Sequence, residues 1–89
     1  MATLIMWYVY IVECSDGSLY TGITNNLTKR IKKHNEGRGA KYTKSRRPVK
    51  LCHSEPAANR KNASQREYEI KSMSKTAKLQ FLKNFPSGF

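Results

Sequence analysis

The sequence has few acidic residues, few cysteines and no long apolar segment. Its longest apolar run lies within residues 1–12, well short of the roughly 20 residues that a membrane-spanning helix needs. The same segment lacks the charged start and the small-residue cleavage site of a secretory signal. With 89 residues, the chain is long enough for one domain. We therefore expect a single small domain that stays in the cytoplasm and binds no membrane.

The cysteines exclude one class of small protein. Two of them, Cys14 and Cys52, are too few for the disulfide framework of a small secreted domain. Together with His34 and His53 they offer four possible zinc ligands, but their positions lack the paired spacing of a zinc site. We interpret both cysteines as small buried apolar residues on strands.

The scarcity of acidic residues leaves the chain strongly basic. Seventeen Lys and Arg against six Asp and Glu give a net charge of +11, which attracts polyanions. The alternative is that the charge only keeps the protein soluble. The basic residues gather in one stretch: Lys29, Arg30, Lys32, Lys33, Arg38, Lys41, Lys44, Arg46, Arg47 and Lys50. Because Gly37, Gly39 and Pro48 interrupt this stretch, it suits nucleic acid better than an amphipathic helix on lipid.

The first half of the chain predicts a β-hairpin. Residues 6–13 are β-branched and aromatic at odd and even positions, which is typical of a central strand covered on both faces. Residues 19–23 predict a second strand. A two-residue turn would place Tyr10 and Tyr20 on opposite faces of the sheet. We favour a three-residue loop over 15–17, which places both tyrosines on one face, with Tyr10 opposite Gly22.

The remaining elements complete a small α+β domain. The expected elements are a helix from an asparagine cap at 25 or 26 to about residue 35, a basic loop over 37–48, a short strand over 49–53 that ends near Pro56, a helix over about 59–73, and a short helix capped by Ser74. The order ββαβαα predicts a three-stranded antiparallel sheet with the first strand central, flanked by three helices. We expect the domain to cover residues 1–83 and a loose tail to follow over 84–89.

Polar residues at positions that should face the core are the candidates for chemistry. On the first helix, Arg30 and His34 share a face with two apolar residues; on the later helix, Glu67 lies between Ala63 and Ile70. An Arg30–Glu67 salt bridge is one explanation, since a buried unpaired cation is costly. The other is that tyrosine, arginine and glutamate together are sufficient for metal-assisted hydrolysis of a phosphodiester.

Five short motifs, in order, resemble the GIY-YIG nuclease domain, above all its small single-domain bacterial branch. They are Tyr-Val-Tyr at 8–10, Tyr-Thr-Gly at 20–22, Asn-Leu-Thr-Lys-Arg at 26–30, Arg-Gly-Ala-x-x-Thr at 38–43 and Ala-x-x-Arg-Glu at 63–67. Tyr8 stands where the family has its first glycine, and Thr21 where it has isoleucine. The resemblance covers about residues 7–75 and supports the same sheet with helices packed around it.

The resemblance implies a metal-dependent endonuclease and a role for each matched residue. Tyr10 would be the general base or proton relay, and Tyr20 would hydrogen-bond the nucleophile or the scissile phosphate. Arg30 would stabilise the charge of that phosphate, and His34 would be a secondary phosphate contact or proton donor. Glu67 would hold a single Mg²⁺ or Mn²⁺ ion.

Substrate binding is expected to rest on the basic residues, because the second DNA-binding module of many relatives is missing from this sequence. Gly22 would leave room for substrate, and the expected phosphate contacts are Lys32, Lys33, Lys41, Lys44, Arg46 and Arg47. The expected partner is nucleic acid, DNA before RNA. Two alternatives remain: a non-catalytic nucleic-acid-binding module, or a subunit of a repair or recombination nuclease that needs a protein partner. The apolar residues Phe81, Phe85 and Phe89 motivate the second alternative.

Overall fold

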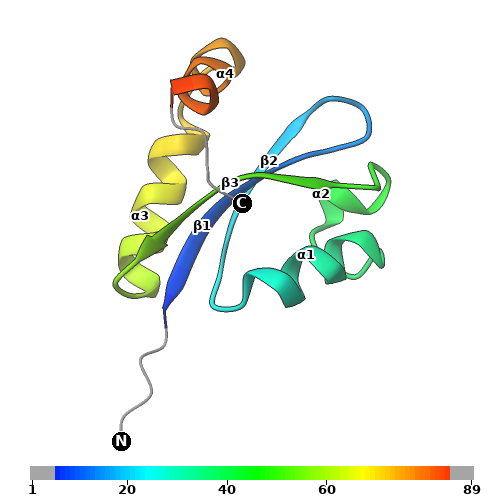
Figure 1. Cartoon of the computed structure of the whole chain (residues 1–89), viewed down its shortest axis with the longest axis horizontal. Coiled ribbons are helices and arrows are strands. Elements are labelled where there is room, and N and C mark those ends of the chain that lie inside the picture. The colour runs from blue at the N-terminus through cyan, green and yellow to red at the C-terminus, as the bar shows by residue number, and fades with distance from the viewer. Residues whose placement is uncertain (1–5, 85–89) are drawn as a thin grey trace, which may run out of the picture.

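The computed structural model describes residues 6–84, which form a three-stranded antiparallel sheet with the order β2-β1-β3 (Figure 1). The strands are β1 (Trp7–Glu13), β2 (Leu19–Thr24) and β3 (Lys50–Ala57); the helices are α1 (Leu27–Asn35), α2 (Lys41–Lys44), α3 (Arg60–Lys71) and α4 (Lys75–Asn84). The expected fold and the central position of β1 are confirmed. Within residues 6–84, no helix is long and apolar enough to cross a bilayer.

The central strand is covered on both faces, as its apolar pattern predicts. Val9 and Ile11 pack with Ala63 and Ile70 of α3. The intervening residues of β1, including Tyr10, pack in a second cluster with apolar residues of α1 and β3. In Figure 1, α3 and α4 accordingly lie on one side of the sheet and α1 and α2 on the other.

The hairpin register decides where the two site tyrosines lie. Gly17 has a φ of +83°, a left-handed conformation that glycine adopts at little cost, and the amide of Cys14 donates to the carbonyl of Ser18. This is the three-residue loop that we favoured. Tyr10 therefore pairs with Gly22, and Val12 with Tyr20, so both tyrosines lie on the same face of the sheet, as expected.

Helix α1 is anchored at both ends. The side chain of Asn26 accepts a hydrogen bond from the amide of Lys29 at 3.1 Å and caps the first turn. At the other end, the Asn35 side chain bonds both backbone groups of Val49, accepting from its nitrogen at 2.7 Å and donating to its oxygen at 3.2 Å. The start of β3 is thereby fixed against the end of α1.

The basic segment 37–48 differs from the expected loop, because it contains the one-turn helix α2. A four-residue helix carries no apolar periodicity, so pattern reading could not find it. It forms because Thr43 is fully buried and its hydroxyl donates to the carbonyl of Ala40 at 3.0 Å. The buried side of this turn closes over the end of α1.

The later elements follow the prediction with shifted ends. Strand β3 ends at Ala57, close to the expected end near Pro56, and it accommodates Pro56 because it is an edge strand, where proline costs no ladder hydrogen bond. Ser74 caps α4, as its hydroxyl oxygen accepts from the amide of Ala77 at 3.1 Å. Most of the expected tail lies outside the described residues.

The cysteines follow the expectation in part. Cys14 is buried directly after β1, but Cys52 is only half-buried on β3, because it is the extra residue of a β-bulge opposite Ile11 and Val12. Among the residues that the structure describes, no group of three or more His, Cys, Asp or Glu side chains could hold a metal ion, which removes the zinc alternative.

Candidate active site

The centre of the site is a chain of hydrogen bonds that starts at Arg30. The Nε of Arg30 lies 3.3 Å from the Tyr10 hydroxyl, which lies 2.8 Å from Nε2 of His34. On the other side of the imidazole, Nδ1 lies 2.7 Å from the hydroxyl of Thr43. Tyr10, His34 and Thr43 are fully buried, whereas Arg30 is half-buried. The chain therefore leads from the surface into the core.

The donors along this chain assign the tautomer of His34. Because the Thr43 hydroxyl donates to Ala40, it can accept from Nδ1–H of His34. The Ala40 amide also approaches Nδ1, at 3.5 Å, and would need this nitrogen as an acceptor, but the 2.7 Å bond to Thr43 outweighs this longer contact. Nε2 is then the acceptor and takes the Tyr10 hydroxyl proton, while that hydroxyl accepts from Arg30, which can only donate.

Burial sets the protonation of both groups in the chain. It lowers the pKa of His34 to about 4, and the nearby positive charge of Arg30 acts in the same direction. Burial also raises the pKa of Tyr10. The hydrogen bond and the positive charge of Arg30 lower this pKa in part, and the negative charge of Glu67 raises it further. At neutral pH, a protonated phenol therefore faces a neutral imidazole. A lowered tyrosine pKa, which a direct base would need, is not found.

Tyr20 lies over His34 from the other side and extends the site toward solvent. Its ring makes an edge contact with the imidazole, with centroids 5.5 Å apart, and stacks on Tyr42 at 5.9 Å. The guanidinium of Arg46 lies 4.0 Å from the centre of the Tyr42 ring. Together these side chains make a continuous line of ring contacts from the buried imidazole to the half-buried Arg46, with aromatic faces suited to nucleic acid.

Glu67 faces the same site, but it does not pair with Arg30. Its carboxylate lies 3.3 Å from the ammonium of Lys71, which also lies 5.9 Å from the centre of the Tyr20 ring. Among residues 6–84, Arg30 forms no ion pair, so the structural salt bridge considered from the sequence is wrong. Glu67 instead acts on the site through its charge, as the pKa of Tyr10 records.

The surroundings of Glu67 fit a magnesium-like ion held by one carboxylate. The side chain is 23% exposed, and Lys71 is its only ion-pair partner in the described part of the chain. Mg²⁺ is commonly held by one or two carboxylates and keeps several waters. A cation at Glu67 would have to displace Lys71, which is half-exposed and free to move toward solvent.

The structure brings some of the expected substrate contacts together and separates others. The space above Gly22 is taken by Tyr10, since a Cβ there would lie 2.5 Å from the phenol oxygen. Lys33 lines a pocket with Arg30, and Arg46 joins the aromatic stack. Arg47 and Lys44 line a different hollow, while Lys32 and Lys41 are exposed. Substrate binding by these residues stays a prediction.

Sequence reasoning missed four residues of the site. Tyr42 and Lys71 are not singled out by the sequence analysis, and Gly39 and Thr43 enter it only as parts of a motif. A side chain at Gly39 would collide with His34, whose Cα would lie 2.9 Å from the added carbon. The motif at 38–43, which holds Gly39 and Thr43, was the available signal. Lys71 lies four residues after Glu67 on one helix, a spacing that indicates an ion pair. The role of Tyr42 depends on tertiary contacts and has no signal in the sequence.

The comparisons with known proteins agree with this geometry. The GIY-YIG catalytic domain matches residues 6–80, so the chain belongs to this family of nuclease domains and, within it, to the small UPF0213 proteins. A UPF0213 protein of Desulfotalea psychrophila is 52% identical over 84 residues, covering 93% of this chain and 76% of that protein. One from Clostridium perfringens is 57% identical over 77 residues, covering 86% and 83%.

Solved structures show the same fold. The solution NMR structure of a UPF0213 protein from Bacillus halodurans is 43% identical, with a TM-score of 0.61, and the match covers 92% of this chain and 87% of that one. A solution NMR structure of a protein from E. faecalis is 39% identical, with a TM-score of 0.63, and the match covers 96% and 91%.

Proposed function

We propose that the protein is a divalent-metal-dependent endonuclease that hydrolyses phosphodiester bonds of DNA or structured nucleic acid. The observation that carries the proposal is the position of Arg30. One guanidinium nitrogen is bonded to the buried Tyr10, and within residues 6–84 the other two nitrogens have no partner. A guanidinium held in this way is ready to bind a phosphate and to stabilise the charge that develops on it.

The site divides into a surface layer and a buried layer. Arg30, Tyr20 and Glu67 are half-buried and can touch a substrate, whereas Tyr10 and His34 lie beneath them and are fully buried. In our proposal Arg30 binds the scissile phosphate, and Tyr20 donates a hydrogen bond to it or to the attacking water. His34 then acts through Tyr10 and makes no direct contact with phosphate.

The buried layer can move a proton without forming a free tyrosinate. When the Tyr10 hydroxyl takes up the proton that the attacking water gives up, the phenol passes its own proton to Nε2 of His34, which then carries the positive charge. The charge of Arg30 is one reason why His34 is a weak base. A phosphate on Arg30 offsets that charge, so substrate binding itself raises the basicity of His34.

Glu67 is the residue that would hold the ion. Mg²⁺ or Mn²⁺ bound there would supply a positive charge that polarises the phosphate and stabilises the leaving oxygen. The protein residues hold and orient the phosphate and accept the proton. The proposal thus gives each residue of the site one task.

The test compares two glutamates of helix α3. Glu67→Gln should lower cleavage of nicked, branched or linear DNA in Mg²⁺ or Mn²⁺ by at least about 100-fold, the scale of losing one strong charge contact in the transition state. Glu69→Gln is the matched control, because Glu69 lies two residues away, is 60% exposed and pairs with Arg66 at 3.6 Å. Equal cleavage by wild type and Glu67→Gln would contradict the proposal and indicate a contaminating nuclease.

One observation favours a second candidate, a nucleic-acid-binding module without catalysis. Tyr10 is closed from solvent and its pKa is raised, as expected for a site that does not turn over on its own. This candidate predicts that the wild type binds DNA but cleaves none of the substrates in either metal.

The partner-dependent alternative has lost part of its motivation. Phe81 is half-buried, against His53 at 4.9 Å between ring centres, and the other two phenylalanines lie outside the described residues. If a protein partner is required, cell extract should restore cleavage to the wild type and not to Glu67→Gln.

A further inference from the structure

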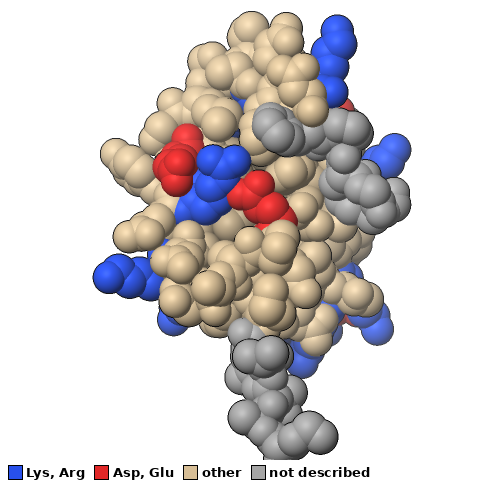
Figure 2. Space-filling model, turned by 60° about the vertical axis from the view of Figure 1, so that its left-hand side comes forward, with Lys and Arg blue, Asp and Glu red and all other residues tan. Residues whose placement is uncertain are grey.

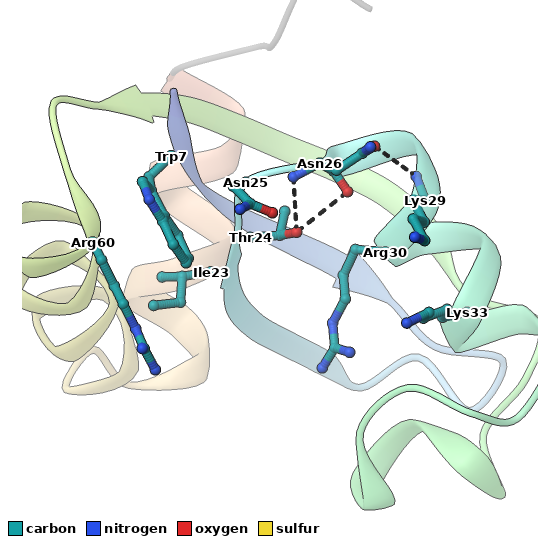
Figure 3. Close-up of a pocket in the computed structure, with 9 residues that line it drawn as sticks. All are labelled: Trp7, Ile23, Thr24, Asn25, Asn26, Lys29, Arg30, Lys33 and Arg60. Atoms are coloured by element: carbon teal, nitrogen blue, oxygen red, sulfur yellow. Dashed lines mark hydrogen bonds between the residues drawn. The ribbon is translucent and has the colours of Figure 1, made fainter. Parts of the chain in front are cut away.

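The pocket that Arg30 and Lys33 line lies where edge strand β2 ends and α1 begins. It encloses about 360 Å³. Figure 3 shows its two walls: Trp7 and Arg60 lie on one side, and Arg30 and Lys33 on the other. Lys29 completes the α1 wall. The pocket thus joins the first turns of α1 and α3, which lie far apart in the sequence.

The charge of this pocket is uncompensated. All of its charged lining residues are cations, namely Lys29, Arg30, Lys33 and Arg60. Within the described residues, none of the four forms an ion pair. Like charges in one hollow repel each other, so the pocket is stabilised by an anion.

Another arginine of α3 shows the contrast. Arg66 lies between two carboxylates, bonded to Glu55 and 3.6 Å from Glu69. Figure 2, which brings the α3 side forward, shows acidic and basic side chains side by side on this face. The lack of counter-charge in the pocket is therefore a local property, even though the whole chain is basic.

The geometry favours a phosphate over a nucleobase in this pocket. The guanidinium of Arg60 lies 5.7 Å from the centre of the Trp7 ring, so it covers a face on which a base would stack. An arginine held over an aromatic ring keeps its donors available for a phosphate oxygen. Arg30 faces Arg60 across the pocket. Two of its guanidinium nitrogens make no hydrogen bond to any residue within 6–84.

The pocket lies beyond the scissile position. Arg60 and Glu67 are seven residues apart on α3, and at 1.5 Å per residue this is about 10 Å along the helix. An ion at Glu67 and a phosphate at Arg60 would therefore serve different phosphates of one strand. Arg30 contributes to both places, because it lines the pocket and bonds Tyr10.

We propose that this pocket binds a backbone phosphate of the nucleic acid next to the scissile one, with Arg60 of α3 as its direct contact and the cations of α1 facing it across the pocket. The inference rests on the proposed nucleic-acid substrate, but it does not require cleavage. The pocket holds the path of the strand past Arg30, and it supplies affinity without reading sequence.

The chain carries its own reporter for this pocket. Trp7 is the single tryptophan of the protein, and it forms part of the wall. Its emission should change when DNA enters the pocket, and the change should saturate together with the binding seen by anisotropy of a labelled duplex. Both measurements are made in EDTA, where metal-dependent cleavage is silent.

Adjacent residues of α3 provide the variant and its control. Arg60→Ala should weaken duplex binding by about tenfold to a hundredfold, the effect of one charged hydrogen bond, and reduce the slope of log K against log salt by about one. Lys33→Ala, on the α1 wall of the pocket, should likewise weaken duplex binding and reduce the salt slope. Lys61→Ala removes the same charge from the next residue, which lines a hollow with Ser64 and Tyr68 instead, and should leave both quantities nearly unchanged.

Two results would overturn the inference. One is equal loss of binding in Arg60→Ala and Lys61→Ala, which would mean that only net charge matters. The other is saturating DNA binding with unchanged Trp7 emission. If instead the pocket behaves as expected while the Glu67 test shows no cleavage, the nuclease proposal fails and the binding pocket stands.

Discussion

At the scale of single residues, the site depends on a histidine that is kept neutral. His34 has no exposed surface, and both ring nitrogens are hydrogen-bonded. A positive charge there would have to be created in the core beside Arg30, which is why its pKa falls to about 4. Because it is neutral, His34 can accept a hydrogen bond from Tyr10. Its low pKa also makes the stability of the fold depend on pH.

The pH dependence of unfolding should report this histidine. Its pKa is about 4 in the folded protein, against an ordinary value of 6.5, so the unfolded chain binds more protons between these values. The free energy of unfolding should therefore fall as the pH falls, by about 2 kcal/mol between pH 7 and pH 4.5. Urea unfolding at a series of pH values measures it.

The control for this measurement is His34→Gln, which keeps a polar side chain but cannot take up a proton. Its free energy of unfolding should be lower at pH 7 and nearly independent of pH over the same range. A wild-type slope that persists in the variant would place the titrating group elsewhere.

At the scale of elements, the one-turn helix α2 acts as a clamp on α1. It presents the buried Thr43, whose hydroxyl bonds both His34 and the carbonyl of Ala40. The close approach of Gly39 to His34 brings this turn into position. A segment that reads as a basic loop in the sequence therefore orients the proton acceptor of the site.

Thr43→Val tests the clamp with almost no change in shape. It leaves Nδ1–H of His34 buried without its acceptor, at a cost of about 1 to 3 kcal/mol in the free energy of unfolding. Ser45→Ala, an exposed position at the end of the same helix, should change stability by less than about 0.5 kcal/mol. Urea unfolding compares the two variants. Equal midpoints would show that α2 does not hold His34.

At the scale of the whole molecule, charge and fold are organised separately. The net charge of +11 is spread over the surface, with its pairs of opposite sign at exposed or half-exposed positions. The core beneath is apolar except for the Tyr10–His34–Thr43 chain and a few other buried polar groups. Long-range attraction brings nucleic acid to the protein, and the small set of residues near Arg30 decides where the strand lies.

Affinity for DNA should accordingly depend steeply on salt. Each neutralised duplex phosphate contributes about −0.9 to the slope of log K against log salt. With contacts at Arg30, the cationic pocket and Arg46, we expect a slope of about −3 or steeper in anisotropy titrations. The joint alanine variant of Lys32, Lys33, Arg46 and Arg47 should have a clearly shallower slope. Affinity that is equal at low and high salt would contradict a phosphate-based interface.

Local patterns in the sequence were sufficient for most of the fold. The apolar residues on both faces of β1, the glycine of the hairpin loop and the caps Asn26 and Ser74 act over a few residues, so sequence reading finds them. The existence of α2 was missed, because the buried contacts of Thr43 decide it.

The sequence by itself determined the order of the elements, the register that sets Tyr10 opposite Gly22, and the inward face of Arg30 and His34, because backbone geometry and helical period dictate these locally. Only the tertiary structure decided that Arg30 bonds Tyr10 and not Glu67, that His34 lies behind the phenol, and that Trp7 and Arg60 meet α1 in one pocket. These contacts join residues twenty or more positions apart, and only the packing of helices around the twisted sheet brings them together.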